Sequence, residues 1–582
     1  MNLLPFLVST LPVGPPPGQI GDVPAEAPSS VAPPFVAVPL DIINREGETE
    51  TITTTCGSPE KNWILEVNGG GIAIGDFDGE GSNDLVIVDG STLERFEAGE
   101  AGLPPRLFLN DGAANFREAG ESFQMAGGRW GTGAATGDVD NDGDLDLVVL
   151  EWGPDRLFLN EDGKGFQEAT EGSGLKGKLW STSGAFLDFD EDGALDLAIA
   201  SYLKFDTESI PSREDGACEW KGYAVMCGPE NLIEQRDALY RGGGDGTFTD
   251  AYFGAGLLPE VPGFGLGITT VDYDADGDTD LYVTNDSTPN YLWQNQGDGK
   301  FVEKGDLANV ALNRDGREQA GMGIGVGDID GDGLADLLVT NFSGESNALY
   351  MSRRSKRKNL VNFKDKAHQR GLFAQSLHRL GWGAGFLDAD LDGVLDAFVL
   401  NGHVYPQADQ SGTDTTYAQQ DDFYRGEGDR FDVLALHDAG PLVGRAGAAA
   451  DLDGDGRPEI VALRQGTPVQ ILRNGTSGGH WLEVRAVGTR SNRDGIGARV
   501  IVSAGERNWY SEIRTAGGFQ AAIPAVAHFG LGDLETLDRV RVEWTSGQVA
   551  EATDVRTDQR LVLEEPAGEV GSSEGDKPGG DQ

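Results

Sequence analysis

The stretch GDVDNDGDLDLVVL, residues 137 to 150, concentrates four carboxylates in a loop of nine residues. The four are Asp138, Asp140, Asp142 and Asp146. Gly143 lies among them, and an apolar run of β-forming residues follows. Like charges at this density repel one another unless a cation lies between them. The stretch therefore predicts a cation site at the start of a β-strand.

The same acidic pattern occurs seven times along the chain. Its copies begin at residues 76, 138, 188, 272, 328, 388 and 451, so successive starts lie 62, 50, 84, 56, 60 and 63 residues apart. This spacing is too long for a linear array of short motifs and fits one four-stranded sheet per repeat.

The residues around each loop indicate the kind of sheet. Runs of very small residues, such as GTGAATG (131–137) and GMGIGVG (321–327), precede the loops, and β-prone runs such as LVVL follow them. A hairpin signal then recurs, as in RLFLNDGAANF (106–116). The fold class is therefore all-β: a seven-bladed β-propeller with calcium-binding blade loops, followed by a small all-β C-terminal domain. The last repeat lacks a return strand, so we expect residues 35–43 to pair with the seventh blade and close the ring.

Oxygen-only ligation in a flexible loop favours Ca²⁺ over Mg²⁺. Side chains at loop positions 1, 3, 5 and 9 and a carbonyl at position 7 would supply the ligands, and glycine at position 6 permits the turn. An EF-hand is excluded because its twelfth position needs glutamate, whereas here that position is Ile87, Val149, Ile199, Val283, Val339, Val399 or Ala462. We expect up to seven Ca²⁺ ions. The candidate ligands are Asp76, Asp78, Glu80 and Asp84; Asp138, Asp140, Asp142 and Asp146; Asp188, Asp190, Asp192 and Asp196; Asp272, Asp274, Asp276 and Asp280; Asp328, Asp330, Asp332 and Asp336; Asp388, Asp390, Asp392 and Asp396; and Asp451, Asp453, Asp455 and Glu459.

Composition limits the possible partners. The chain of 582 residues carries a formal charge of −51 and 86 glycines. Such an acidic field argues against nucleic acid and anionic membranes as partners. The sequence has no apolar run long enough for a transmembrane helix. We expect a monomer with an unidentified protein or glycan partner.

The repeats resemble FG-GAP/VCBS repeats of the integrin-α type, and the C-terminal part resembles the ASPIC/UnbV domain. The motifs that carry the second resemblance are NRDGIGARVIV (492–502), AGGF (516–519), HFGLGD (528–533) and VRVEWTSGQV (540–549). Together with NGHVYPQAD (401–409) and CEWKGYAVMCGP (218–229), they resemble the family of cartilage acidic protein 1 and its bacterial relatives. The resemblance implies a secreted or surface-displayed calcium-binding protein, and it does not imply an enzyme activity.

The expected domain organisation has four parts. Residues 1–34 form a Pro-rich leader, which is either a weak secretion signal or a disordered segment. The propeller spans 35–475, the ASPIC/UnbV-like domain spans 476–565, and an acidic tail spans 566–582. We expect a secreted, extracellular or cell-surface location, with the periplasm as an alternative.

Three further features have either a structural or a functional interpretation. Cys218 and Cys227 predict a local disulfide in an exported protein, with a reduced pair as the alternative, and Cys56 is then a lone buried thiol. The basic run RRSKRK (353–358) is a solvated loop or an anion site. His403 is a hydrogen-bonded turn histidine or a catalytic residue.

Three classes of function remain open at this stage. The first is an extracellular calcium-stabilised scaffold for adhesion or binding. The second is a secreted enzyme that acts on polysaccharide through the propeller channel, although the sequence has no H-E-x-x-H motif and no P-loop. The third is a structural protein of an envelope or matrix.

Overall fold

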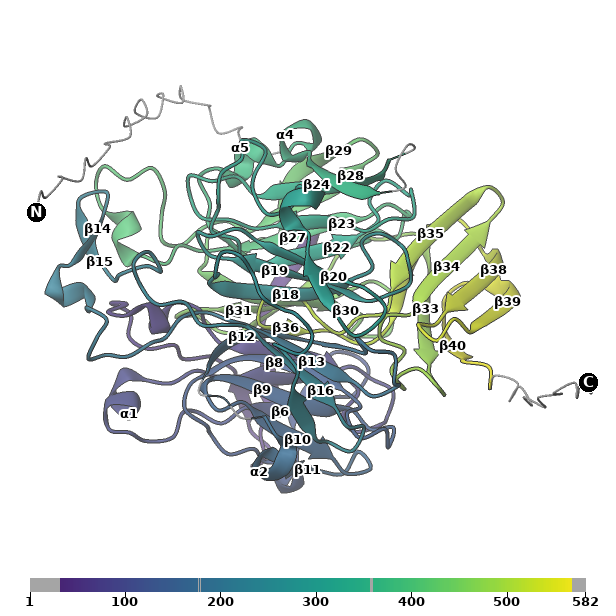
Figure 1. The fold of residues 1–582 in the computed structure, drawn as a ribbon, viewed down its shortest axis with the longest axis horizontal. Coiled ribbons are helices and arrows are strands. Elements are labelled where there is room, and N and C mark those ends of the chain that lie inside the picture. Colours follow the sequence, from purple (N-terminus) through teal and green to yellow (C-terminus); the bar gives the residue numbers. More distant parts are fainter. Residues whose placement is uncertain (1–31, 176, 178, 356–359, 568–582) are drawn as a thin grey trace, which may run out of the picture.

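The computed structural model describes residues 32–175, 177, 179–355 and 360–567. Most of the predicted leader and all but 566–567 of the predicted tail therefore lie outside the described residues. Strands dominate, and the helices are single short turns (Figure 1). The helical turns are α1 (Leu93–Glu97), α2 (Thr170–Ser173), α3 (Gly305–Ala308), α4 (Ala367–Arg370), α5 (Phe373–Ser376), η1 (Ile64–Glu66), η2 (Glu121–Phe123), η3 (Arg213–Asp215) and η4 (Pro406–Asp409).

In the part of the chain that the structure describes, seven four-stranded antiparallel units, here called blades 1 to 7, make up the larger part of the fold. The first strands are β4 (Gly71–Gly75), β8 (Gly131–Gly137), β12 (Leu179–Leu187), β18 (Gly265–Val271), β22 (Ile324–Gly327), β26 (Gly381–Leu387) and β30 (Gly444–Ala450). The second strands are β5 (Asp84–Val88), β9 (Asp146–Gly153), β13 (Asp196–Ser201), β19 (Asp280–Asn285), β23 (Asp336–Val339), β27 (Asp396–Asn401) and β31 (Glu459–Arg464). Every acidic loop joins the first strand of its blade to the second.

The outer half of each blade is the predicted hairpin. The third strands are β6 (Arg106–Asn110), β10 (Arg156–Asn160), β16 (Ala238–Gly242), β20 (Tyr291–Asn295), β24 (Ala348–Arg354), β28 (Asp422–Glu427) and β32 (Gln470–Asn474). The fourth strands are β7 (Phe116–Glu118), β11 (Phe166–Glu168), β17 (Phe248–Asp250), β21 (Phe301–Glu303), β25 (Val361–Asp365), β29 (Arg430–Ala435) and, in blade 7, β1 (Phe35–Pro39). Each first strand contacts the next one in order, and β30 contacts β4. The expected all-β propeller class is therefore confirmed.

The N-terminal segment closes the ring by a route that differs in part from the prediction. Strand β1 pairs antiparallel with β32, from Phe35 opposite Asn474 to Pro39 opposite Gln470. Beyond it the chain leaves blade 7. The side chain of Leu40 is buried in a core that blades 1 and 7 share. Strand β2 (Asp41–Ile43) then pairs in parallel with β7 of blade 1 and antiparallel with β3 (Thr49–Thr51). Residues 35–39 alone complete blade 7, and residues 41–43 extend blade 1.

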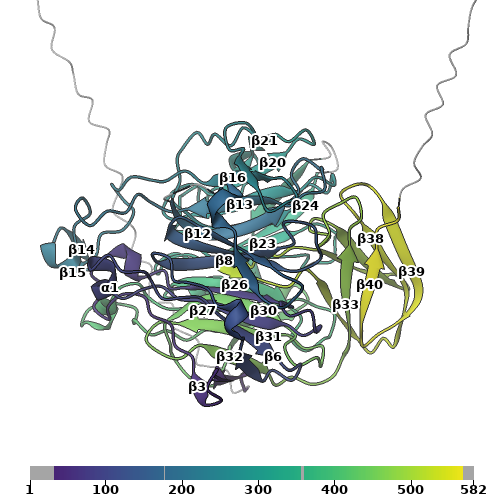
Figure 2. The ribbon, with the colours of Figure 1, turned by 90° about the horizontal axis from the view of Figure 1, so that it is seen from below.

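The C-terminal part forms a second body made of two sheets. One sheet contains β37 (Ala527–Gly532), β33 (His480–Val487) and β40 (Gln559–Glu564). The other contains β35 (Arg507–Glu512), β34 (Arg499–Ala504), β38 (Thr536–Glu543) and β39 (Val549–Arg556). Alternating apolar residues of both sheets, such as Val484, Val500 and Val540, form one buried core between them. Figures 1 and 2 place this body at one side of the propeller.

One loop of this second body enters the centre of the propeller. Its strand β36 (Ala521–Ala522) pairs in parallel with β4, and Gly518 bridges to Ile268 of blade 4 (Figure 1). The neighbouring Phe519 is fully buried, and its ring centroid lies 5.1 Å from that of Trp382 in blade 6. Residues 514–524 therefore plug the channel, and we refer to them as the plug.

The predicted disulfide is confirmed. Cys218 and Cys227 are bonded with their Cα atoms 5.2 Å apart, and they bracket the hairpin of β14 (Cys218–Trp220) and β15 (Tyr223–Val225). Both Figure 1 and Figure 2 show this hairpin on the side of the propeller opposite the C-terminal body. It reaches blade 6, where the Tyr223 hydroxyl donates to the Ser411 carbonyl at 2.8 Å. Cys56 is a free, buried thiol, as predicted.

Candidate metal centres

The ninth residue of each acidic loop fixes the loop to its blade. In the second loop, one oxygen of Asp146 accepts the Val139 N–H at 2.9 Å and the other accepts the Asn160 N–H at 2.8 Å. The first contact closes the loop, and the second reaches the end of the third strand. All seven loops repeat this pair of contacts, at 2.7 to 3.4 Å. The ninth carboxylate is therefore a structural acceptor as well as a candidate ligand.

The first residue of each loop holds the turn. Asp138 accepts the N–H groups of Asp142 and Gly143 at 3.0 and 2.9 Å. The same pattern occurs at Asp188, Asp272, Asp328 and Asp388. Gly143 has φ +102°, a conformation that favours glycine. The sequence-predicted role of glycine at position 6 is thus matched by the backbone.

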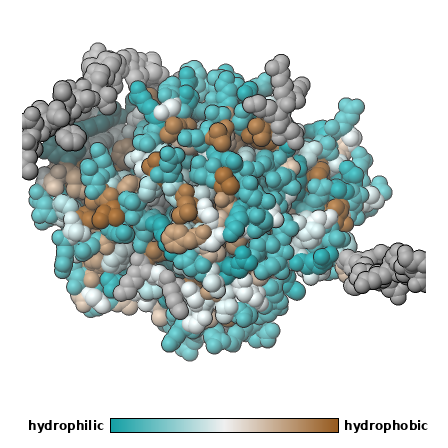
Figure 3. Space-filling model, in the orientation of Figure 1, coloured by the Kyte–Doolittle hydropathy of each residue, from teal (hydrophilic) through white to brown (hydrophobic). Residues whose placement is uncertain are grey.

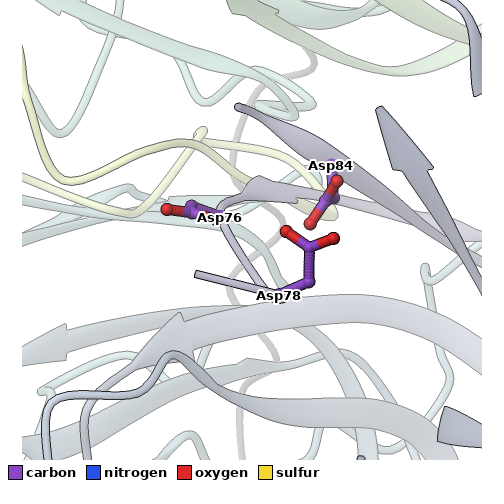
Figure 4. A group of neighbouring side chains, drawn as sticks. All are labelled: Asp76, Asp78 and Asp84. Carbon is purple, nitrogen blue, oxygen red and sulfur yellow. The ribbon is translucent and has the colours of Figure 1, made fainter. Parts of the chain in front are cut away.

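The third residue keeps one oxygen without a partner in several loops, although Asp190 pairs with Arg241 and Asp274 accepts from the Gln294 amide. Ligand oxygens lie within 4.8 Å of one another in seven groups among the described residues, including five triads: Asp76, Asp78 and Asp84; Asp138, Asp140 and Asp146; Asp188, Asp190 and Asp192; Asp272, Asp274 and Asp276; and Asp328, Asp330 and Asp332. Figure 4 shows the side chains of the first triad, with Asp78 and Asp84 turned toward each other. Among the described residues, one buried oxygen each of Asp76, Asp140, Asp190 and Asp274 has no hydrogen-bond partner.

A divalent cation fits this donor set. A buried carboxylate oxygen without a donor carries a large desolvation cost. The unpartnered oxygens face other carboxylates, so a proton donor does not satisfy them, whereas a hard cation would. Oxygen-only ligands in a flexible turn suit Ca²⁺. Glu80 and Asp142 are exceptions among the predicted ligands, because each is exposed and lies outside the triad of its loop.

The electrostatics of the loops support the same interpretation. Burial, followed by the neighbouring Asp494 carboxylate, raises the pKa of Asp138 to about 7. Burial also raises the pKa of Asp388 to about 8 and that of Asp146 to about 8. Such shifts mean that ionising these carboxylates together, without a counter-charge, destabilises the folded protein.

The C-terminal body covers the acidic loops, a feature that the sequence did not predict. Asp494 accepts the Asp138 N–H at 2.8 Å, and Glu512 accepts the Asp272 N–H at 3.2 Å. Other loops are held through backbone carbonyls: Gly81 by Arg560, Gly333 by Arg499, Gly393 by Trp509 and Gly456 by His528. In the remaining loop, a Cβ on Gly193 would lie 2.5 Å from the Arg490 carbonyl oxygen. All seven acidic loops therefore lie on the face that this body covers.

Two family models match the chain in these regions. The FG-GAP-like repeat matches residues 76–149, 138–199 and 272–339, and the model described as ASPIC and UnbV matches residues 488–570. Cartilage acidic protein 1 from Mus musculus is 26% identical over 357 residues, covering 58% of this chain and 50% of that protein. Its Homo sapiens counterpart is 24% identical over 357 residues, covering 58% and 49%. The chain is therefore similar to cartilage acidic protein 1 over these residues. It spans about half the length of the curated relatives that it matches.

Solved structures similar to this chain include two lectins. A structure on recognition of non-reducing terminal N-acetylglucosamine by an Agrocybe aegerita lectin has a TM-score of 0.37 and 14% identity, covering 69% of this chain and 90% of that one. The BP39L lectin from Burkholderia pseudomallei has a TM-score of 0.41 and 12% identity, covering 70% and 95%. An exotype rhamnogalacturonan lyase has a TM-score of 0.34 and 12% identity, covering 86% and 92%. Likeness at these TM-scores carries no inference about function.

The remaining candidate residues of this cartilage acidic protein 1 relative have structural explanations. His403 is fully buried, with Nε2 3.1 Å from the Ser343 hydroxyl and Nδ1 accepting the Tyr405 N–H at 3.0 Å. Burial lowers its pKa to about 3, so the ring is neutral and acts as a turn histidine, as predicted. In the basic run, Arg353 donates to Asn362 and Arg354 donates to the Asp274 carbonyl, while 356–358 lie outside the described residues.

Proposed function

We propose that this protein is a calcium-binding β-propeller scaffold that binds a protein or glycan partner outside the cell. The observation that carries the proposal is the set of buried, unpartnered carboxylate oxygens within the acidic triads. In each loop, the residues at positions 1, 3, 5 and 9 would hold the ion, with Glu80 and Asp142 contributing least because they lie outside the triads of their loops. Bound calcium would supply positive charge that offsets the mutual repulsion of these carboxylates.

The plug favours binding over catalysis in the channel. In many propellers, substrates reach residues that line the central channel. Here the backbone of Ile72 donates to the Gln520 carbonyl at 3.0 Å, and the Gln520 N–H donates to the Ser183 hydroxyl at 2.9 Å. The plug thus occupies hydrogen-bonding positions inside the ring, and a polymer could not thread past it. The outer surface is left for recognition, and the face in Figure 3 is mostly hydrophilic with small separate apolar patches.

The proposed location rests on the disulfide. A bond between Cys218 and Cys227 persists in oxidising compartments and is rare in the cytosol. Extracellular calcium modules commonly bind at about 10⁻⁴ to 10⁻³ M, which suits the same compartment. In the part of the chain that the structure describes, no helix has the length and apolar character needed to cross a membrane.

A thermal melt with calcium titration tests the metal sites. We expect the metal-stripped protein to melt well below the protein in millimolar Ca²⁺, because each site filled at tenfold excess over Kd adds about 1.4 kcal/mol. Asp272→Ala and Asp328→Ala should each remove part of this gain. Asp298→Ala, at an exposed hairpin outside the loops, is the matched control and should leave it unchanged. A midpoint that does not respond to Ca²⁺ would refute the calcium proposal.

A second experiment tests the binding role. The whole protein is screened on glycan and protein arrays with and without Ca²⁺, and binding should require the ion. Release of reducing or unsaturated ends from a polysaccharide mixture would instead identify an enzyme.

A further inference from the structure

The channel is asymmetric around the plug. The first strands of blades 1, 2 and 4 are buried along their whole length, and β12 of blade 3 is buried beyond its first residue. In blades 5 to 7, the corresponding strands are only half-buried near the end that leads into the acidic loop. The half-buried residues are Val326 and Gly327, Gly385 and Phe386, and Ala449 and Ala450. The plug pairs its strand with blade 1, so it fills the channel unevenly.

The unfilled part is a cavity of about 670 Å³ between blades 5 to 7 and the C-terminal body. Val326 and Phe386 of the propeller and Ile523 and Pro524 of the plug give it an apolar wall. Strand β35 lies over it and contributes Ser511. The volume lies within the range of sites that bury a small organic ligand.

Three arginines give the cavity a polar end. Arg499 and Arg507 line it, each over an aromatic ring, at 5.1 Å from Tyr510 and 4.5 Å from Trp509. Neither forms an ion pair within the described residues. Arg514 donates to the Val326 carbonyl and to Glu512, both at 3.3 Å, and its buried Nε has no partner among the described residues.

Some of the acidic groups around the cavity are engaged, whereas Asp330, Asp429 and Glu506, which also line it, accept no hydrogen bond among the described residues. Glu512 is paired with Arg514 and accepts the Asp272 N–H, and Glu483 is paired with Arg560 at 3.0 Å. The position-one carboxylates of the three bordering loops accept N–H groups of their own turns. The positively charged hydrogen-bond donors that line the cavity are Arg499, Arg507 and Arg514.

We propose that this cavity binds a small amphipathic carboxylate, with its head group at Arg514 and its apolar part against Val326, Phe386 and Ile523. Charge-assisted hydrogen bonds from a guanidinium to a carboxylate are short and strong, and the apolar wall would bury the rest of the molecule. The residues proposed to contact the ligand are not candidate metal ligands, although Asp328, Asp388 and Asp451 also line the cavity.

Calorimetric titration of the whole protein with dodecanoate, at a Ca²⁺ concentration below the solubility limit of calcium dodecanoate, tests the proposal. We expect saturable binding at one site. Dodecyl maltoside keeps the chain with a neutral head, and acetate keeps the head without the chain, so both should bind at least about tenfold more weakly.

Variants locate the site. Ser511→Phe fills the cavity and should abolish dodecanoate binding. Ser209→Phe is the control and should not, because Ser209 is exposed on the propeller and does not line the cavity. Arg514→Gln should weaken binding at least about tenfold, and Arg514→Lys should restore part of it. Thermal melts with Ca²⁺ show that each variant is folded. The proposal would be overturned if binding were not saturable, if Ser511→Phe bound dodecanoate as well as the wild type, or if dodecyl maltoside bound equally well. None of these results would change the calcium titration of the wild-type protein.

Discussion

At the scale of single residues, the acidic loops combine two functions that are separable by position. The ninth carboxylate uses both oxygens to accept backbone N–H groups, so it stabilises the blade even without metal. The fifth carboxylate accepts one N–H, as Asp192 does from Ala194 at 2.9 Å. An asparagine can keep one acceptor but turns the other into a donor. Substitution at the two positions therefore has different consequences.

We expect Asp196→Asn to destabilise the protein with and without Ca²⁺, by about 1–3 kcal/mol, because its amide group would face the N–H of Phe189 or Gly242. Asp192→Asn keeps its loop contact and should lose stability only when Ca²⁺ is present. Denaturant unfolding in Ca²⁺ and in chelator measures both variants. Equal losses in chelator would contradict the division of roles.

Outside the loops, a second residue position recurs before the third strands. Asp237 accepts the Ser201 N–H at 2.8 Å, as Asn290 accepts that of Asn285 at 2.8 Å and Asn347 that of Asn341 at 3.2 Å. Burial raises the pKa of Asp237 to about 7 from an ordinary value of 3.8. The folded state thus binds more protons than the unfolded state between these values. The contribution of Asp237 to stability is greatest below pH 4 and falls as pH rises toward 7.

Asp237→Asn should remove this pH dependence while it keeps the hydrogen bond to Ser201. Relative to wild type, we expect the free energy of unfolding of the variant to be higher by on the order of 1–3 kcal/mol at pH 8 and unchanged near pH 4. Unfolding free energies measured across that range at constant Ca²⁺ provide the comparison. A constant difference between the two proteins at all pH values would contradict the prediction.

At the scale of elements, local patterns predicted the acidic loops, their glycines and the hairpins that follow, since each depends on neighbours within one repeat. The plug was not predicted. Its strand has two residues, and its partner Ile72 lies at the other end of the chain, so no local periodicity marks it. Runs of small residues in the first strands precede the acidic loops. They also make room for the plug, because a Cβ on Gly267 would lie 2.9 Å from the Gly518 carbonyl oxygen.

Gly518 should be the most sensitive position of the plug. Its φ is +84°, and a Cβ there would lie 2.3 Å from the Ile324 carbonyl oxygen. Gly518→Val should therefore cost several kcal/mol and displace the plug, because strain and a backbone clash act together. Gly547→Val is the matched control, since φ is +77° there but no atom lies within 4 Å. Thermal melts and limited proteolysis of residues 514–524 compare the two, and similar behaviour would show that the plug tolerates a side chain.

At the scale of the whole molecule, the C-terminal body lies over seven acidic loops in a protein of formal charge −51. It contributes carboxylates of its own beside two of them, Asp494 and Glu512, which increases repulsion when metal is absent. Its cationic contacts are weaker: Arg493 lies 3.7 Å from Asp138, and Arg560 lies 3.9 Å from Asp451. Cations held by the loops would offset the excess negative charge at this interface.

We therefore expect chelation to loosen the C-terminal body before the blades unfold. Hydrogen exchange should rise first in residues 488–494 and in the plug, while strands β5, β9 and β19 stay protected. Mg²⁺ is the control, since it prefers octahedral sites with several waters and should restore protection less well than Ca²⁺. High salt in chelator should restore part of the protection, because repulsion between exposed carboxylates is screened over about 10 Å at 0.1 M. Simultaneous exchange of plug and blades would mean that the loops stabilise each blade individually and that the interface does not depend on them.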